Sequence, residues 1–124
     1  MLVKSTASGP GSTTVADVAA LSYGELALAI SCSGMPTGRP QGVKEDPMAY
    51  ALDGLARVGV DKLRRLNAEA SRLVEVKYFG PDKPARRAAS MAHDQLWGGA
   101  RRFDRAHGLA GRLWHRLADL RAVA

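Results

Sequence analysis

The chain has 124 residues, of which 46% are hydrophobic and 24% are charged, a composition typical of a globular protein rather than a disordered one. No apolar run approaches the ~20 residues that a membrane-spanning helix needs, and no basic-then-apolar segment predicts a secretory signal. The single cysteine, Cys32, excludes an internal disulfide and a cysteine-cluster zinc site. Together these features predict one small protein of the reducing cytoplasm.

Charge is distributed unequally along the chain. Residues 57–124 hold 15 Lys and Arg against 7 Asp and Glu, whereas residues 1–56 hold 3 against 5. A basic half on a small intracellular protein indicates a polyanionic partner, most often nucleic acid. A solvated, Arg-rich helical surface is the alternative interpretation.

The amino-terminal part predicts a tail, two short helices and a loop. Residues 1–14 are rich in Ser, Thr and Gly and predict a flexible tail. Ser22 and Glu25 have the spacing of a capping box, which predicts the boundary between the two helices, and Gly34 suits the end of the second. Residues 35–46 hold too many Pro and Gly for a regular element and predict a long loop.

A longer helix is predicted to begin at Asp46 and Pro47, residue types that favour the N-cap and the first helical position. Its apolar residues recur at intervals of three and four, which places them on one helix face. We expect an interruption at Asn67, after which a helical pattern continues to a stop at Gly80.

The carboxyl-terminal part has the element order of a helix-turn-helix. The predicted segments are a helix over 69–79, a short Ala-rich helix over 83–92 and a tight turn at His93–Asp94. A longer helix follows, and its first part, 94–107, completes the helix-turn-helix. We therefore predict an all-α fold, a small helical bundle containing a helix-turn-helix. In this prediction 15–124 is a single domain, with its amino-terminal helices and loop in 15–67 and the helix-turn-helix in 69–124.

The last helix predicts a recognition surface. If Leu96 and Phe103 point into the bundle, a cationic face is left free to enter a major groove, where Arg and Gln suit guanine and adenine edges. The side chains of this face predicted to contact DNA are Gln95, Trp97, Arg101, Arg102 and Arg105, of which Gln95, Arg101 and Arg102 suit base edges. Those predicted to contact phosphates are Lys83, Arg86 and Arg87. The alternative is an ordinary three-helix bundle, in which Trp97 is a half-buried core residue.

Four short motifs resemble, in their order and spacing, the phage antitermination protein Q family of the phage-21 type. They are Gly38-Arg39-Pro40-Gln41, Asp46-Pro47-Met48, Gly54-Leu55-Ala56-Arg57 and Val76-Lys77-Tyr78-Phe79. The carboxyl-terminal half is also similar to the DNA-binding fourth region of sigma factors, at Ala88-Ala89 and over Arg101–His107.

This resemblance implies a specific activity. Such a protein binds double-stranded DNA near a phage late promoter, with two protomers as one arrangement. It then loads onto host RNA polymerase that is paused with its sigma factor, and it hinders RNA hairpin formation at the exit channel. The resemblance thus implies a non-enzymatic transcription antiterminator in the bacterial host cytoplasm, with nascent RNA as a further partner and no membrane contact. Arg39 and Lys44 in the long loop are candidates to face RNA or polymerase.

Two other functions are alternatives. One is another phage helix-turn-helix protein, either a terminase small subunit or a repressor. The other is a host-takeover inhibitor whose basic face docks on an acidic host protein. An enzyme is the least supported option, because no nucleophile–base pair is apparent. The three histidines lack the further ligands that a structural zinc requires, so we expect no metal and no cofactor.

Overall fold

The computed structural model describes residues 13–36 and 44–123. In these residues the chain is all-α, with no strand, as predicted. Within the same residues, each helix is either too short or too polar to cross a bilayer.

Two short capped helices begin the described chain. Helix α2 (Val15–Ala19) is capped by Thr14, and α3 (Tyr23–Ser31) is capped by Ser22. The Ser22 hydroxyl accepts from the Glu25 N–H at 3.2 Å, and the Glu25 carboxylate accepts from the Ser22 N–H at 2.9 Å. The predicted capping box is therefore confirmed, because both of its hydrogen bonds form. Of the predicted tail, residues 1–12 lie outside the described residues, and Thr14 is the N-cap of α2.

The next helix, α4 (Pro47–Phe79), is 33 residues long and begins as predicted, with the Asp46 side chain accepting from the Met48 N–H. The expected interruption at Asn67 is wrong, because the helix continues through it. Asn67 packs against Gly24 of α3 so closely that a Cβ atom on Gly24 would overlap the Asn67 side chain. This tertiary contact outweighs the weak preference of asparagine against the interior of a helix. The break in regular geometry lies instead at Gly59, where φ is 83° and ψ is 158°.

The last three helices also differ from the prediction. Helix α5 (Lys83–Trp97) begins at the predicted Asp82 cap but runs through His93 and Asp94, so the expected turn there is wrong. The chain turns at Gly98 and Gly99, both with positive φ, and the Gly99 N–H donates to the Asp94 carbonyl at 2.8 Å. Only glycine adopts this geometry readily, which is why the helix ends there. Helices α6 (Ala100–Arg116) and α7 (Ala118–Val123) follow.

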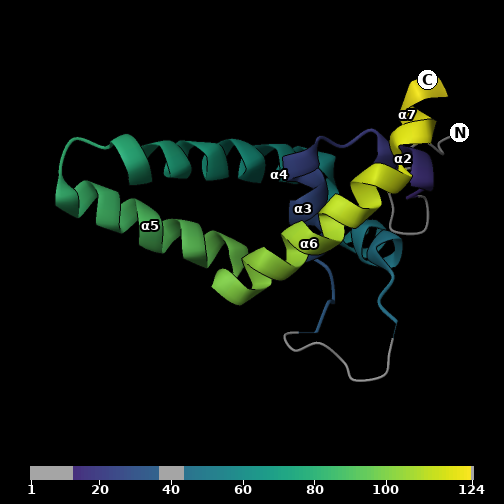
Figure 1. Cartoon of the computed structure of the whole chain (residues 1–124), viewed down its shortest axis with the longest axis horizontal. Helices are drawn as coiled ribbons and strands as arrows, with labels where there is room; N and C mark the ends of the chain where they lie inside the picture. Colours follow the sequence, from purple (N-terminus) through teal and green to yellow (C-terminus); the bar gives the residue numbers. More distant parts are fainter. Residues whose placement is uncertain (1–12, 37–43, 124) are drawn as a thin grey trace, which may run out of the picture.

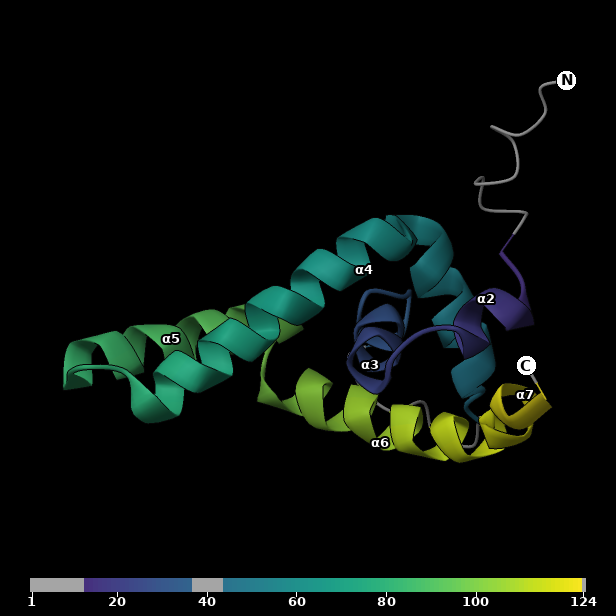
Figure 2. The ribbon, with the colours of Figure 1, turned by 90° about the horizontal axis from the view of Figure 1, so that it is seen from above.

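The helices form two regions, which Figures 1 and 2 show from different sides. The amino-terminal part of α4 packs with α2, α3, α6 and α7 around a core of large side chains, and we call this region the body. The remainder of α4 and the antiparallel α5 project away from it as a helical hairpin, residues 68–97. Helix α5 packs along α4 and meets α6 mainly at the glycine corner. A helix-turn-helix is therefore not shown.

Candidate functional site

The predicted recognition surface is largely turned inward. Trp97 is only 4% exposed and belongs to the body core, so its expected position on an outward face is wrong. Its ring packs edge-on against Phe103, with 5.1 Å between centroids, and lies 4.6 Å from the His107 ring. The reason is that the glycine corner folds the start of α6 back toward the end of α5, which brings these rings together.

Arg102 is held by the end of α3. Its guanidinium donates to the Ser31 carbonyl at 2.9 and 2.6 Å, to Met35 at 3.0 Å and to Ser33 at 3.1 Å. The last carbonyls of a helix have no intrahelical partner, so a cation placed there satisfies them. Arg102 is therefore engaged inside the fold and not presented to solvent as expected.

Arg105 is engaged in the same way. Its guanidinium donates to the Pro36 carbonyl at 2.5 Å and pairs with the Glu45 carboxylate. The Arg105 side chain is 14% exposed and that of Glu45 is 7% exposed. A pair this buried fixes the start of α4 and its preceding chain to α6, and it leaves Arg105 poorly placed to read a base edge.

The other predicted contact residues remain accessible. Gln95, Arg101, Lys83 and Arg87 are exposed, whereas Arg86 is half-buried and donates to the Gly80 carbonyl at 3.0 Å. In the proposed loop pair, Lys44 is exposed and Arg39 lies outside the described residues. The structure therefore divides the predicted residues into an engaged set, formed by Trp97, Arg86, Arg102 and Arg105, and an exposed set, chiefly on α5.

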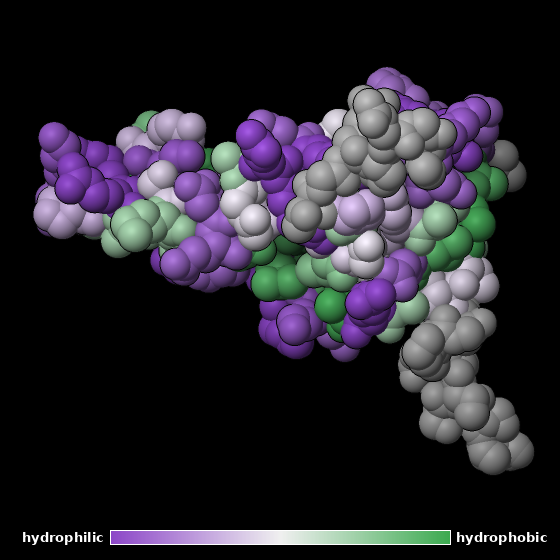
Figure 3. Space-filling model, turned by 90° about the horizontal axis from the view of Figure 1, so that it is seen from below, coloured by the Kyte–Doolittle hydropathy of each residue, from purple (hydrophilic) through white to green (hydrophobic). Residues whose placement is uncertain are grey.

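The far end of the hairpin, residues 77–87, combines cations with exposed aromatic rings. Phe79 is 82% exposed and Tyr78 is 64% exposed. The segment holds four Lys and Arg and a single acidic residue, Asp82, which caps α5. Within the described part of the chain, Lys83 and Arg87 make no ion pair. Figure 3 shows this end of the molecule, on the left, as mainly hydrophilic.

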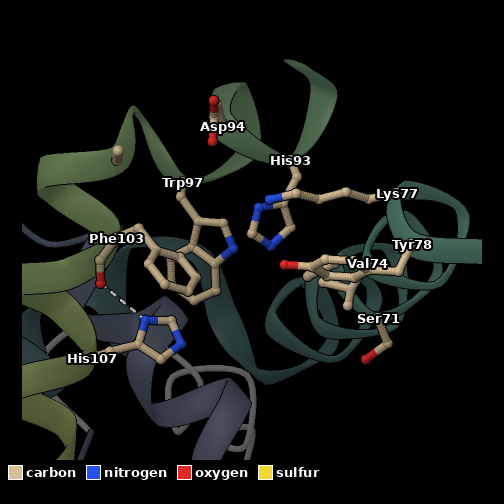
Figure 4. A pocket seen from close by; sticks show the side chains of 11 residues that line it. Ser71, Val74, Lys77, Tyr78, His93, Asp94, Trp97, Phe103 and His107 are labelled. Carbon is tan, nitrogen blue, oxygen red and sulfur yellow. Dashed lines mark hydrogen bonds between the residues drawn. The ribbon is translucent and has the colours of Figure 1, made fainter. Parts of the chain in front are cut away.

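A pocket of about 640 Å³ lies in the elbow where the hairpin meets α6. Helix α4 contributes Lys77 and Tyr78, α5 contributes His93 and Asp94, and α6 contributes aromatic rings (Figure 4). Polar and aromatic groups therefore converge on one concave surface, as they do in small-ligand sites.

Trp97 supplies an unsatisfied donor in the wall of this pocket. Its indole Nε1 is buried and has no hydrogen-bond partner among the described residues. In Figure 4 the nitrogen points toward the side of the pocket that holds the His93 ring and the Tyr78 hydroxyl. A buried donor without an acceptor costs about 1–3 kcal/mol, so an acceptor that reached the N–H by displacing the side chains that cover it would relieve that cost.

The two pocket histidines differ in their surroundings. Burial lowers the pKa of His93 below its ordinary value of 6.5, and Lys77 and His107 lower it further, while Asp94 acts in the opposite direction. His93 is therefore neutral near pH 7. His107 Nδ1 lies 2.9 Å from the Phe103 carbonyl, and if it donates there, Nε2 is left as an acceptor.

Sequence reasoning did not group these pocket residues. His93 and Trp97 stand four residues apart, as do Phe103 and His107, and each pair therefore lies on one helix face. The missing signal was the Gly98-Gly99 pair, which marks the corner that brings the two faces together.

Searches among known protein families, curated proteins and solved structures found no match to this chain.

Proposed function

We propose that this protein binds nucleic acid with the far end of the hairpin and that it acts as a phage late-gene transcription antiterminator. The observation that carries the proposal is the combination, on residues 77–87, of exposed aromatic rings with cations that make no ion pair among the described residues. The antitermination role in this proposal comes from the sequence resemblance to the phage antitermination proteins. The contact differs from the one expected, because it uses α5 and the hairpin end instead of a recognition helix.

The exposed cations on α5 suit a phosphate backbone. Lys83 and Arg87 are one helical turn apart and both are exposed, and Gln95, farther along α5, is exposed as well. Cations that have no carboxylate partner retain their full attraction for phosphates, and binding to phosphates releases counterions. Contacts of this kind position a protein on nucleic acid without reading its sequence.

The exposed rings suit unpaired bases. Phe79 is the most exposed large hydrophobic side chain among the described residues, and it belongs to the same segment, residues 77–87, as the cations. Aromatic rings next to a cationic track are the usual means of holding single strands, because each base offers a face for stacking. A protein that grips nascent RNA in this way would oppose the folding of a terminator hairpin.

The first experiment measures binding to labelled duplex DNA and to single-stranded RNA at rising salt. The double variant Lys83→Ala/Arg87→Ala should bind more weakly, and the slope of log affinity against log salt on duplex should fall by about 2, close to one per phosphate contact. The matched control is Arg112→Ala/Arg116→Ala, which removes the same charge from exposed positions on α6 and should keep most of the binding. Equal loss in both variants would contradict a hairpin contact.

The second experiment tests the antitermination role. Run-off transcription by host polymerase from a phage late promoter past a terminator should show more read-through with the protein, and less with the double variant. A protein that binds DNA but leaves the terminator fully effective would be a repressor or a terminase subunit. Absence of affinity for any nucleic acid at low salt would favour a host-protein inhibitor.

A further inference from the structure

We propose that the elbow pocket binds one unstacked nucleotide, either free or as part of a single strand. The pocket shares Lys77 and Tyr78 with the end of the hairpin but does not include Lys83 or Arg87, so variants at these two cations test the proposed hairpin contact separately from the pocket. The buried indole N–H of Trp97 is the observation that points to a ligand, because no group in the described chain accepts from it.

The polar groups of the pocket match the edge of a base. The Trp97 N–H requires an acceptor, and a base carbonyl is one. Asp94 is exposed at the rim of the same pocket and can accept from a donor, which an exocyclic amino group provides. Cytosine and guanine carry both a carbonyl and an amino group, so the pocket favours these two bases.

The remaining groups match the rest of a nucleotide. Tyr78 is the exposed wall of the pocket, and its ring presents a face on which a base can stack. The Lys77 Nζ lies 5.5 Å from the centre of that ring, so a phosphate attached to the stacked nucleoside comes within reach of the cation. A volume of about 640 Å³ is within the range of small-ligand pockets.

The test follows the indole N–H itself by ¹⁵N NMR. The chain has two tryptophans, so the variant Trp114→Phe identifies the Trp97 indole signal. Addition of cytidine or guanosine monophosphate should shift this signal downfield, as a new hydrogen bond does. Ribose 5-phosphate, which has the phosphate and sugar but no base, should not shift it.

Variants then separate the pocket from unspecific attraction. Lys77→Met should weaken nucleotide binding about tenfold, the usual effect of losing a charge-assisted hydrogen bond. Lys62→Met removes the same charge from an exposed position of α4 outside the pocket and should leave the affinity unchanged. Lys83→Ala/Arg87→Ala should keep the nucleotide-induced shift even if it abolishes binding to duplex DNA, so the two proposals can fail independently.

A short single-stranded oligonucleotide distinguishes the two sources of the ligand. A shift with the oligonucleotide alone assigns the pocket to a strand, and a shift with the mononucleotide as well assigns it to a free nucleotide. If neither moves the Trp97 signal at millimolar concentration, or if Lys77→Met and Lys62→Met bind alike, the proposal is overturned.

Discussion

The body and the hairpin are both made of paired helices, but they differ in what they bury. In the body, the consecutive residues Leu26–Ile30 of α3 are all buried, because other helices surround α3. Apart from His93 and Trp97 at the elbow, the hairpin buries only Ala70, Leu73 and Ala89 between its two helices, and it leaves large apolar side chains at its far end exposed. Burial of apolar surface is the main stabilising term, so the body should hold most of the stability.

The cations differ between the two regions in the same way. Arg102 and Arg105 of α6 are bonded to backbone carbonyls or a carboxylate within the body. Lys83 and Arg87 of α5 are exposed. The comparison shows that basic residues in a sequence divide into structural and available ones only when the fold is known.

The largest effect is expected where α3 crosses α4 in the body. A Cβ atom on Gly54 would overlap the backbone carbonyl of Ala29, so Gly54→Ala should lower the free energy of unfolding by more than about 3 kcal/mol. Gly108→Ala on the exposed face of α6 meets nothing within 4 Å and should raise it by about 0.5–1 kcal/mol. Urea denaturation followed by circular dichroism measures both. Similar values for the two variants would show that the crossing is less close than described.

The next effect concerns the engaged cations. Arg105→Met leaves the Glu45 carboxylate buried without its partner, so it should cost about 2–3 kcal/mol, somewhat less than a fully buried pair because both side chains keep some exposure. Arg101→Met changes an exposed Arg on the same helix and should stay within about 0.5 kcal/mol of the wild type. Thermal or urea unfolding decides this. If Arg105→Met left the free energy of unfolding unchanged and weakened DNA binding, Arg105 would contact DNA as the sequence predicted, and its burial against Glu45 would be contradicted.

A smaller and more local effect is expected in the hairpin. Leu73→Ala should cost about 2 kcal/mol, at the low end for a buried leucine, because the other buried hydrophobic side chains of residues 68–96 are the alanines Ala70 and Ala89. Hydrogen exchange should accelerate in the hairpin amides while the α3 amides keep their protection. Leu28→Ala, in the α3 core, should instead accelerate exchange throughout. Identical exchange patterns in the two variants would mean that body and hairpin unfold as a single unit.

The smallest effect is the pH dependence from His93. Because its pKa is below 6.5 in the folded chain, the unfolded chain binds more protons as the pH falls through that value. The free energy of unfolding should therefore be highest above pH 6.5 and decrease below it. His93→Gln should show a shallower decrease between pH 7 and pH 5 in urea titrations. An equal decrease in both proteins would assign the effect to other groups.

The sequence alone determined the fold class and where several helices begin. The caps formed by Ser22 with Glu25, by Asp46 and by Asp82 each join atoms two or three residues apart, so local pattern is sufficient to predict them. The stop after Phe79 follows for the same reason, since Gly80 and Pro81 are adjacent.

Only the tertiary structure decided which functional candidates are free. Arg102 finds its acceptors 67–71 residues away, Arg105 contacts a carbonyl 69 residues away, and Trp97 is buried by rings beyond the glycine corner. Helical spacing places these side chains on a face of their own helix, but it does not determine what that face packs against. The elbow pocket likewise exists because the Gly98-Gly99 turn sets α6 beside the hairpin, an arrangement that no periodicity within one helix contains.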